Sequence, residues 1–260
     1  MTRTTPAFLP ALLATALALL PPAAHALDPI DTDGPDFVES SEVVPQGHFQ
    51  YEVDFTSTRN RAGREPEPGF STPTLLKYGF ARDWELRIAP EGYDRLDGRH
   101  GAGDTALGVK WHVQDRDEAT GAPSVAWIFH VDTPSGARDF RGTGYRPSLR
   151  AVVTWDLPDD FALGLMPGLK YDTRSSDGQR FTAGILGLVL NRRLSEADRV
   201  FAEVSAPQIA PMRDGGTQVY ASLGAAHMIG NDAQVGIRAG VGANHNTPHR
   251  QVLVEIAQRF

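Results

Sequence analysis

The last stretch of the chain, residues 249–260, alternates between apolar and polar positions. Its apolar face carries Val252, Val254, Ile256 and Phe260, and its polar face carries Gln251, Glu255 and Arg259. A period of two residues is typical of a β-strand whose two faces meet different surroundings. About ten residues is the length of a tilted membrane-spanning strand. Taken alone, the stretch fits such a strand and the edge strand of a soluble β-sandwich equally well.

The same alternation recurs along the chain and predicts about twelve antiparallel strands. They span approximately residues 49–56, 74–80, 84–89, 106–113, 125–131, 149–156, 161–170, 181–193, 199–206, 218–225, 234–241 and 251–260. The stretch 181–193 is apolar on both faces, so its register stays open. Long and short connections alternate, as they do in barrels with long outer loops and short periplasmic turns. The sequence therefore predicts an all-β fold, an antiparallel transmembrane outer-membrane β-barrel of about 12 strands.

Two further features favour the barrel over the sandwich. All four tryptophans fall on the apolar face close to predicted periplasmic turns, which predicts an aromatic girdle at one bilayer interface, formed by Trp84, Trp111, Trp127 and Trp155. The strand that ends the chain at Phe260 resembles the closing strand of bacterial outer-membrane barrels, although Gln258 stands where an apolar residue is usual. We therefore expect the barrel-assembly machinery to engage this strand.

The start of the chain predicts export. It contains one early charge (Arg3), an apolar run at residues 11–20 and the small-residue sequence Ala24-His25-Ala26. These features are typical of a signal peptide, here residues 1–26, cleaved after about Ala26 in a Gram-negative exported protein. Residues 27–47 are polar and acidic and predict a periplasmic tail or partial plug, and residues 48–260 form the predicted barrel. No later stretch has eighteen consecutive apolar residues, so no transmembrane helix is expected.

Composition bears on stability and partners. The chain has no cysteine, so its stability comes from a source other than disulfides, such as the closed hydrogen-bond ladder of a barrel. A formal net charge of −7 argues against nucleic acid as a partner. Arginines gather in the predicted outer loops, at Arg59, Arg61, Arg64, Arg95, Arg99, Arg138, Arg141, Arg174, Arg180 and Arg213. Because guanidinium suits bidentate phosphate contact, we expect outer-membrane lipid and lipopolysaccharide as partners; ordinary solvated loop charge explains these arginines equally well.

The polar faces of the strands predict a charged lumen. The residues expected to line it are Glu52, Asp54, Lys77, Glu85, Arg87, Lys110, His112, His130, Arg150, Asp156, Lys170, Glu203, Arg238 and Glu255. Charges inside a barrel must be hydrated or paired. Twelve strands lie between the eight that fill themselves and the sixteen that leave a channel, so we expect a narrow pore or one blocked by the tail and loops. Charges of both signs argue against strong ion selectivity.

The sequence offers no enzymatic motif. It contains no phosphate-binding glycine loop, no HExxH, no cysteine ligands and no nucleophile elbow. We therefore predict no catalytic residue, no metal site and no cofactor. His112 and His130 face the predicted lumen on neighbouring strands, where a hydrogen-bonded histidine is the default and a metal or proton-transfer role is the alternative.

Four segments, Asp31–Asp54, Leu75–Ile88, Gly101–Trp111 and Thr133–Phe140, together with the pattern of the whole mature chain, resemble a family of outer-membrane transporters labelled "putative MetA-pathway of phenol degradation". The resemblance implies a roughly twelve-stranded outer-membrane barrel with a transport role. It implies no catalytic or binding residues, and its label associates the family with aromatic degradation.

The expected function is passive or facilitated passage of small solutes, with aromatic or hydrophobic compounds as the class that the family label suggests. Two alternatives stay open. A lipid-modifying barrel enzyme would need a serine, a histidine and a third polar residue together on the lipid-facing outer rim, and the one apolar-face histidine, His227, lies near the periplasmic side. A sealed structural or surface-interaction barrel would have a similar sequence, with its lumen closed by salt bridges.

Overall fold

The structure, a computed structural model, describes residues 27–59, 68–117, 119–174 and 177–260. The predicted signal peptide and the loop residues Arg61 and Arg64 lie outside this part. The described strands are β1 (Phe49–Arg59), β2 (Gly69–Ser71), β3 (Thr74–Ala81), β4 (Trp84–Pro90), β5 (Tyr93–Leu96), β6 (Arg99–Ala102), β7 (Thr105–Gln114), β8 (Ser124–Thr133), β9 (Arg146–Leu157), β10 (Phe161–Thr173), β11 (Arg180–Arg193), β12 (Asp198–Ile209), β13 (Gln218–Ile229), β14 (Ala233–Gly242) and β15 (Arg250–Arg259). A 3₁₀ turn, η1, spans Met212–Asp214.

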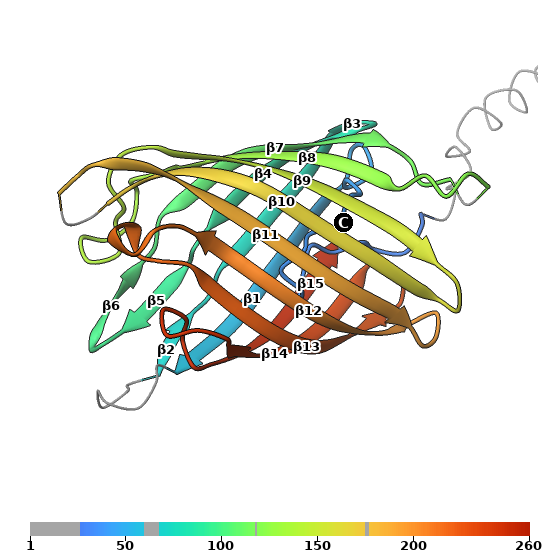
Figure 1. Ribbon diagram of the computed structural model, residues 1–260. Helices are drawn as coiled ribbons and strands as arrows, with labels where there is room; N and C mark the ends of the chain where they lie inside the picture. The colour runs from blue at the N-terminus through green and yellow to red at the C-terminus, as the bar shows by residue number, and fades with distance from the viewer. Residues whose placement is uncertain (1–26, 60–67, 118, 175–176) are drawn as a thin grey trace, which may run out of the picture.

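Twelve strands close into an antiparallel barrel (Figure 1). Their order is β1, β3, β4 and then β7 to β15, and β15 returns to pair with β1 from Gln50↔Arg259 to Arg59↔Arg250. This pairing joins the two ends of the sheet, so the predicted fold is confirmed. β2, β5 and β6 continue the sheet beyond the barrel, with β2 pairing to the far end of β1 at Thr56–Thr58. None of the described helices is long and apolar enough to cross a membrane.

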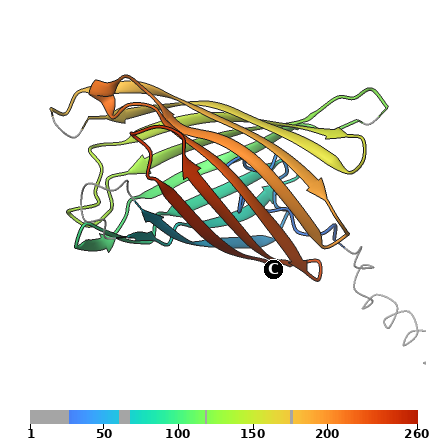
Figure 2. The ribbon, with the colours of Figure 1, turned by 60° about the horizontal axis from the view of Figure 1, so that its bottom comes forward.

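The two ends of the barrel differ in the length of their connections. At the short-turn end, residues 82–83, 158–160, 194–197 and 230–232 join neighbouring strands, and the slightly longer connection 115–123 does the same. Asp159 and Asp160 adopt positive φ (62° and 61°), which lets this turn reverse the chain in three residues. The opposite, long-loop end carries the connections 91–104, 134–145, 210–217 and 243–249 (Figure 2). The N-terminal end of β1 and the C-terminal end of β15 both lie at the short-turn end.

The outer wall is apolar and exposed, and the inner wall is polar. Outward residues such as Leu107, Phe129 and Leu188 are 50%, 46% and 45% exposed, whereas most inward charges are buried. β11, whose register the sequence leaves open, turns Ala183, Gly187 and Val189 inward and Leu186, Leu188 and Leu190 outward. This inside-out distribution is that of a barrel whose solvent on the outside is lipid.

The tryptophans lie on the outer wall near the short-turn end. Trp84, Trp111 and Trp127 occupy directly paired positions on β4, β7 and β8. The rings of Trp84 and Trp111 stack at 5.3 Å between centroids, and Trp155 lies two residues from the end of β9. Phe260 joins the same level, stacking on Phe49 and Tyr51 at 6.4 and 6.1 Å.

Candidate functional site

All fourteen residues expected in the lumen lie on the inward faces of their strands. Most of them are buried, namely Glu52, Lys77, Glu85, Arg87, Lys110, His112, His130, Glu203 and Glu255. Asp54, Arg150, Lys170 and Arg238 are half-buried, and Asp156 is exposed at the short-turn end. The sequence places these side chains on one surface. Some of them pair with each other, such as Lys77 with Glu52 and Arg87 with Glu85, and others pair with a segment that is not part of the barrel wall.

That partner is residues 30–46, here called the inner segment, which enters the barrel from the short-turn end (Figure 1). It forms no strand, and among the described residues its one bridge is Gln46↔Gly79. Its backbone N–H groups instead donate to carboxylates of the wall. Asp33 N donates to Glu52 Oε2 at 3.1 Å, Phe37 N to Glu203 Oε2 at 2.5 Å and Val44 N to Glu85 Oε2 at 2.9 Å. The segment is therefore held across β1, β12 and β4.

Asp33 of the inner segment sits among three cations of the wall. Its carboxylate lies 3.0 Å from Lys77 Nζ, 3.0 Å from Arg87 Nη1 and 2.6 Å from Lys110 Nζ. Burial by itself would raise the pKa of Asp33, but Arg87, Lys110 and Lys77 outweigh it and hold the pKa well below its usual value. Asp33 is therefore a buried anion that the wall compensates.

Glu39 bridges two guanidinium groups on β4 and β9. Its Oε2 accepts from Arg87 Nη2 at 2.6 Å and its Oε1 contacts Arg150 Nη1. His130, on β8 between them, accepts from Arg87 Nε at 3.0 Å through Nε2, and its Nδ1 lies 3.1 Å from Arg150 Nη2. Burial raises the pKa of Glu39, but the charges of Arg150 and Arg87 lower it overall to about 2. Glu39 is thus also ionised at neutral pH.

Two glycines make room for these side chains. Gly108 pairs with both Arg87 and His130, and a Cβ at this position would overlap His130 Cδ2. Gly168 pairs with Arg150, and a Cβ there would lie 2.6 Å from Arg150 Cγ. These two glycines were not among the residues expected from the sequence, where the only signal for this role is a glycine on the inward face opposite a long polar side chain.

An apolar recess adjoins the guanidinium pair. Val38 packs against inward residues of five successive strands, β8 to β12: Ile128, Val152, Met166, Val189 and Phe201. Phe37 packs against the same cluster. Ile128 and Val152 stand two residues from His130 and Arg150 along the same inward faces, a rise of about 6.8 Å. The lumen therefore presents a cationic surface and an apolar surface side by side.

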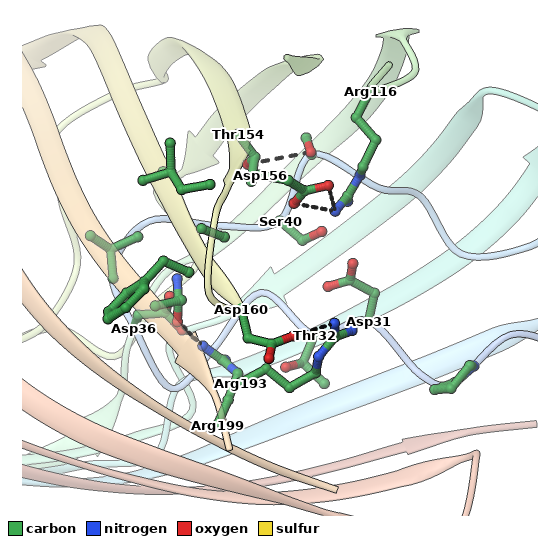
Figure 3. A pocket seen from close by; sticks show the side chains of 18 of the residues that line it. Asp31, Thr32, Asp36, Ser40, Arg116, Thr154, Asp156, Asp160, Arg193 and Arg199 are labelled. Atoms are coloured by element: carbon green, nitrogen blue, oxygen red, sulfur yellow. Dashed lines mark hydrogen bonds and ion pairs between the residues drawn. The ribbon is translucent and has the colours of Figure 1, made fainter. Parts of the chain in front are cut away.

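A cavity of about 1160 Å³ opens at the short-turn end and reaches this place. Its lining includes Val38, Glu39, Gly164 and Val189. Charge pairs border it (Figure 3): Arg116 with Asp156 at 3.1 Å, Arg193 with Asp160 at 2.8 Å and Arg199 with Asp36 at 2.9 Å. Water thus reaches one side of the inner segment.

At the long-loop end, Asp104 anchors the connection 134–145. Its carboxylate accepts from Gly136 N, Gly142 N and Arg146 Nη2, each at 2.8 Å. These bonds lower the pKa of Asp104 despite its burial, which acts in the opposite direction. Among the loop arginines, Arg174 pairs with Asp214 at 2.5 Å and Arg141 donates to Gly136 O at 2.8 Å, so both are used within the loops.

Around His227, the apolar-face histidine considered for a lipid-modifying enzyme, the described residues do not form a nucleophilic triad. His227 faces outward at the short-turn end, and its Nδ1 lies 2.8 Å from Asp198, which also accepts from Ser195 Oγ at 2.7 Å. The aspartate separates the other two residues, whereas a nucleophilic serine must contact the imidazole. The two ring nitrogens of His112 form hydrogen bonds with Ser41 O and Asp115 Oδ1 rather than with His130. In the described ranges no three His, Cys, Asp or Glu residues are grouped to hold a metal ion.

Comparison with known proteins gives a family and a fold. The family model described as "Putative MetA-pathway of phenol degradation" matches residues 32–260. No curated protein sequence matches the chain.

Solved structures of outer-membrane barrels are similar in fold. The NanC porin is 10% identical with a TM-score of 0.55, over 80% of this chain and 97% of that one. The beta domain of the Bordetella autotransporter BrkA is 14% identical with a TM-score of 0.51, over 83% and 99%. The KdgM porin is 13% identical with a TM-score of 0.50, over 80% and 99%. At these identities the likeness concerns the fold alone.

Proposed function

Since the chain belongs to the family described as "Putative MetA-pathway of phenol degradation", we propose that it is a non-enzymatic outer-membrane channel or transporter for small solutes, closed by its inner segment. The observation that carries this proposal is the way the inner segment is held. Side-chain ion pairs and hydrogen bonds to the wall hold it, and a single β-bridge is its only sheet pairing. It can therefore leave without any strand of the barrel unpairing.

The charges around the inner segment favour a lumen that water enters when the segment leaves. Around Asp33 and Glu39 the wall contributes four cations, Lys77, Arg87, Lys110 and Arg150, and two carboxylates, Glu52 and Glu85. These six wall groups together with Asp33 and Glu39 make four positive and four negative charges; without Asp33 and Glu39, the six wall groups keep a net charge of +2. Buried charge that lacks a partner must be hydrated, so departure of the segment draws water into the lumen.

The proposed orientation places the short-turn end in the periplasm and the long-loop end outside the cell, as in other outer-membrane barrels. The inner segment then closes the channel from the periplasmic side. The mature chain starts at about Leu27 after removal of residues 1–26, which N-terminal sequencing of the outer-membrane form checks. The solutes are small and include aromatic or hydrophobic compounds.

Two proposed partners act at the surface. The strand that ends at Phe260 is the contact for the barrel-assembly machinery, and loss of outer-membrane insertion in Phe260→Ala would support this role. Exposed loop arginines such as Arg95, Arg99 and Arg138 contact lipopolysaccharide phosphates. Unchanged outer-membrane retention after their joint replacement by glutamine would rule that contact out.

A sealed structural barrel is the second candidate, and the buried ion pairs of the inner segment are the observation in its favour. Solute flux separates the two. Proteoliposomes that contain the full-length protein are placed in isosmotic arabinose, which does not readily cross the bilayer, and their swelling is recorded. A channel gives swelling above that of protein-free liposomes, and Asp33→Asn increases it. A sealed barrel gives no swelling in either form.

A further inference from the structure

We propose that the place now filled by Phe37, Val38 and Glu39 is a binding site for aromatic carboxylates, which displace these residues on their way through the lumen. The inference deepens the proposed channel function and rests on it for the route by which solute arrives. The inner segment would then act as a tethered competitor of the solute.

The first support is the chemistry that the site already recognises. Glu39 presents a carboxylate to Arg87 and Arg150, one oxygen to each guanidinium. Two arginines on a carboxylate form a strong, charge-assisted arrangement that is specific for a planar anion. The strands that carry them, with Gly108 and Gly168 opposite, pair with neighbouring strands of the barrel and not with the inner segment.

The second support is the unused hydrogen-bonding capacity of Arg150. Its Nε is buried and has no partner. Its Nη2 faces His130 Nδ1, but a neutral imidazole has one acceptor nitrogen, and Nε2 already accepts from Arg87. Among the described residues, Glu39 is the one carboxylate within ion-pair distance of Arg150. A free carboxylate that is not constrained by a peptide backbone can satisfy this guanidinium more fully.

The third support is the recess beside the guanidinium pair. A Cβ at Gly187 would lie 2.6 Å from Val38 Cγ2 and 3.0 Å from Phe37 Cδ1, and a Cβ at Gly164 would lie 3.1 Å from Val38 Cγ1. The missing side chains on β10 and β11 thus create a hollow in which an aromatic ring and an isopropyl group rest. Val38, which rests there, and Glu39, which contacts both guanidinium groups, are consecutive residues with Cα atoms about 3.8 Å apart, so a ring joined to a carboxylate by two methylene groups can reach from one place to the other.

The fourth support is access. The cavity of about 1160 Å³ is lined by Val38, Glu39, Gly164 and Val189, so the site borders open space. A small aromatic acid can approach the recess from the short-turn end before the whole inner segment has moved.

The test is equilibrium dialysis of 3-phenylpropionate against the full-length protein in detergent. Glu39→Gln weakens the internal competitor and keeps both arginines, so it is expected to bind the probe at least about tenfold more tightly than the wild type. Asp28→Asn removes the same charge from an exposed residue just before the inner segment and is expected to leave the affinity for the probe unchanged.

Specificity is tested in the Glu39→Gln form. Arg150→Gln is expected to weaken binding about 30-fold or more, whereas Lys170→Gln, which removes a lumen charge on the neighbouring strand, leaves it unchanged. Propionate, which lacks the ring, and 3-phenylpropanamide, which lacks the charge, are each expected to bind at least about tenfold more weakly.

Three results would overturn the proposal: equal affinity of wild type and Glu39→Gln, equal affinity for 3-phenylpropionate and inorganic phosphate or propionate, or equal losses in Arg150→Gln and Lys170→Gln. Because dialysis needs no membrane, it separates the two ideas. Probe binding by a protein that conducts nothing would contradict the channel and keep the site. Flux without improved binding in Glu39→Gln would contradict the site and keep the channel.

Discussion

Replacing Asp33 by asparagine is expected to release the inner segment. Asp33 is 5% exposed and compensates Lys77, Arg87 and Lys110. Removing one partner of a buried ion pair costs about 3–5 kcal/mol because the other charge is left uncompensated. Asparagine keeps a hydrogen-bond acceptor, so we expect the lower part of this range. Since the barrel strands do not involve Asp33, the cost falls on the seating of the segment.

The expected shift is large enough to measure directly. At 1.4 kcal/mol per factor of ten, about 3–5 kcal/mol raises the ratio of released to seated segment roughly 100- to 4,000-fold. The chain has no cysteine, so a single Ser41→Cys reports on the segment, because Ser41 is 2% exposed when seated. Its rate of modification by a water-soluble maleimide follows the released population.

The control is Asp28→Asn in the same Ser41→Cys background, which makes the same charge change at an exposed residue just before the inner segment. Labelling that rises in Asp33→Asn and not in Asp28→Asn supports the reasoning, provided that circular dichroism shows an intact barrel. Equal labelling of the Asp33→Asn and Asp28→Asn forms would refute it, because Asp33 would then contribute nothing specific to the seating.

Three other perturbations follow from the same contacts. Gly108→Ala places a Cβ against His130 Cδ2, so a loss of about 1–3 kcal/mol in unfolding free energy relative to the wild type is expected, measured by urea titration. Asp104→Asn weakens three hydrogen bonds to a charged acceptor, worth about 1.5–3 kcal/mol each at most, so protease should cut the 134–145 connection faster than in Asp97→Asn. The pKa of Glu39 is about 2 when the inner segment is seated and is ordinarily 4.5. Because the seated pKa is the lower one, ionised Glu39 stabilises the seated segment fully above about pH 4.5. This stabilisation is lost as the pH falls toward about 2. Maleimide is unsuited to that range, so release of the inner segment is measured by limited pepsin cleavage. Cleavage is expected to rise with acid for the wild type and to stay constant for Glu39→Gln.

The wall of the barrel was predictable from the sequence because each strand repeats one alternation. Trp111 and Lys110, for example, must face opposite ways once the period is two. The register of the stretch 181–193 could not be predicted in this way, for a physical reason. Val189 faces inward yet is apolar because it packs on Val38, so both faces of β11 are apolar and the period gives no register.

The site itself could be predicted only in part. Fourteen lumen side chains follow from the alternation, and the need to pair buried charges follows from electrostatics. The partners do not, because the inner segment is extended and aperiodic, and nothing local to Asp33 or Glu39 indicates Lys110 or Arg150, which lie 77 and 111 residues away along the chain. Such long-range pairing is fixed by the closure of the barrel around the segment.

Single-channel recording most directly tests the central claim that this barrel is a channel closed by its inner segment. The mature protein is refolded and inserted into planar bilayers with and without residues 27–47. We expect rare or small openings for the intact form and steady, larger conductance for the truncated one. Silence in both forms, from barrels shown to be folded, would contradict it and leave the sealed structural barrel as the better reading.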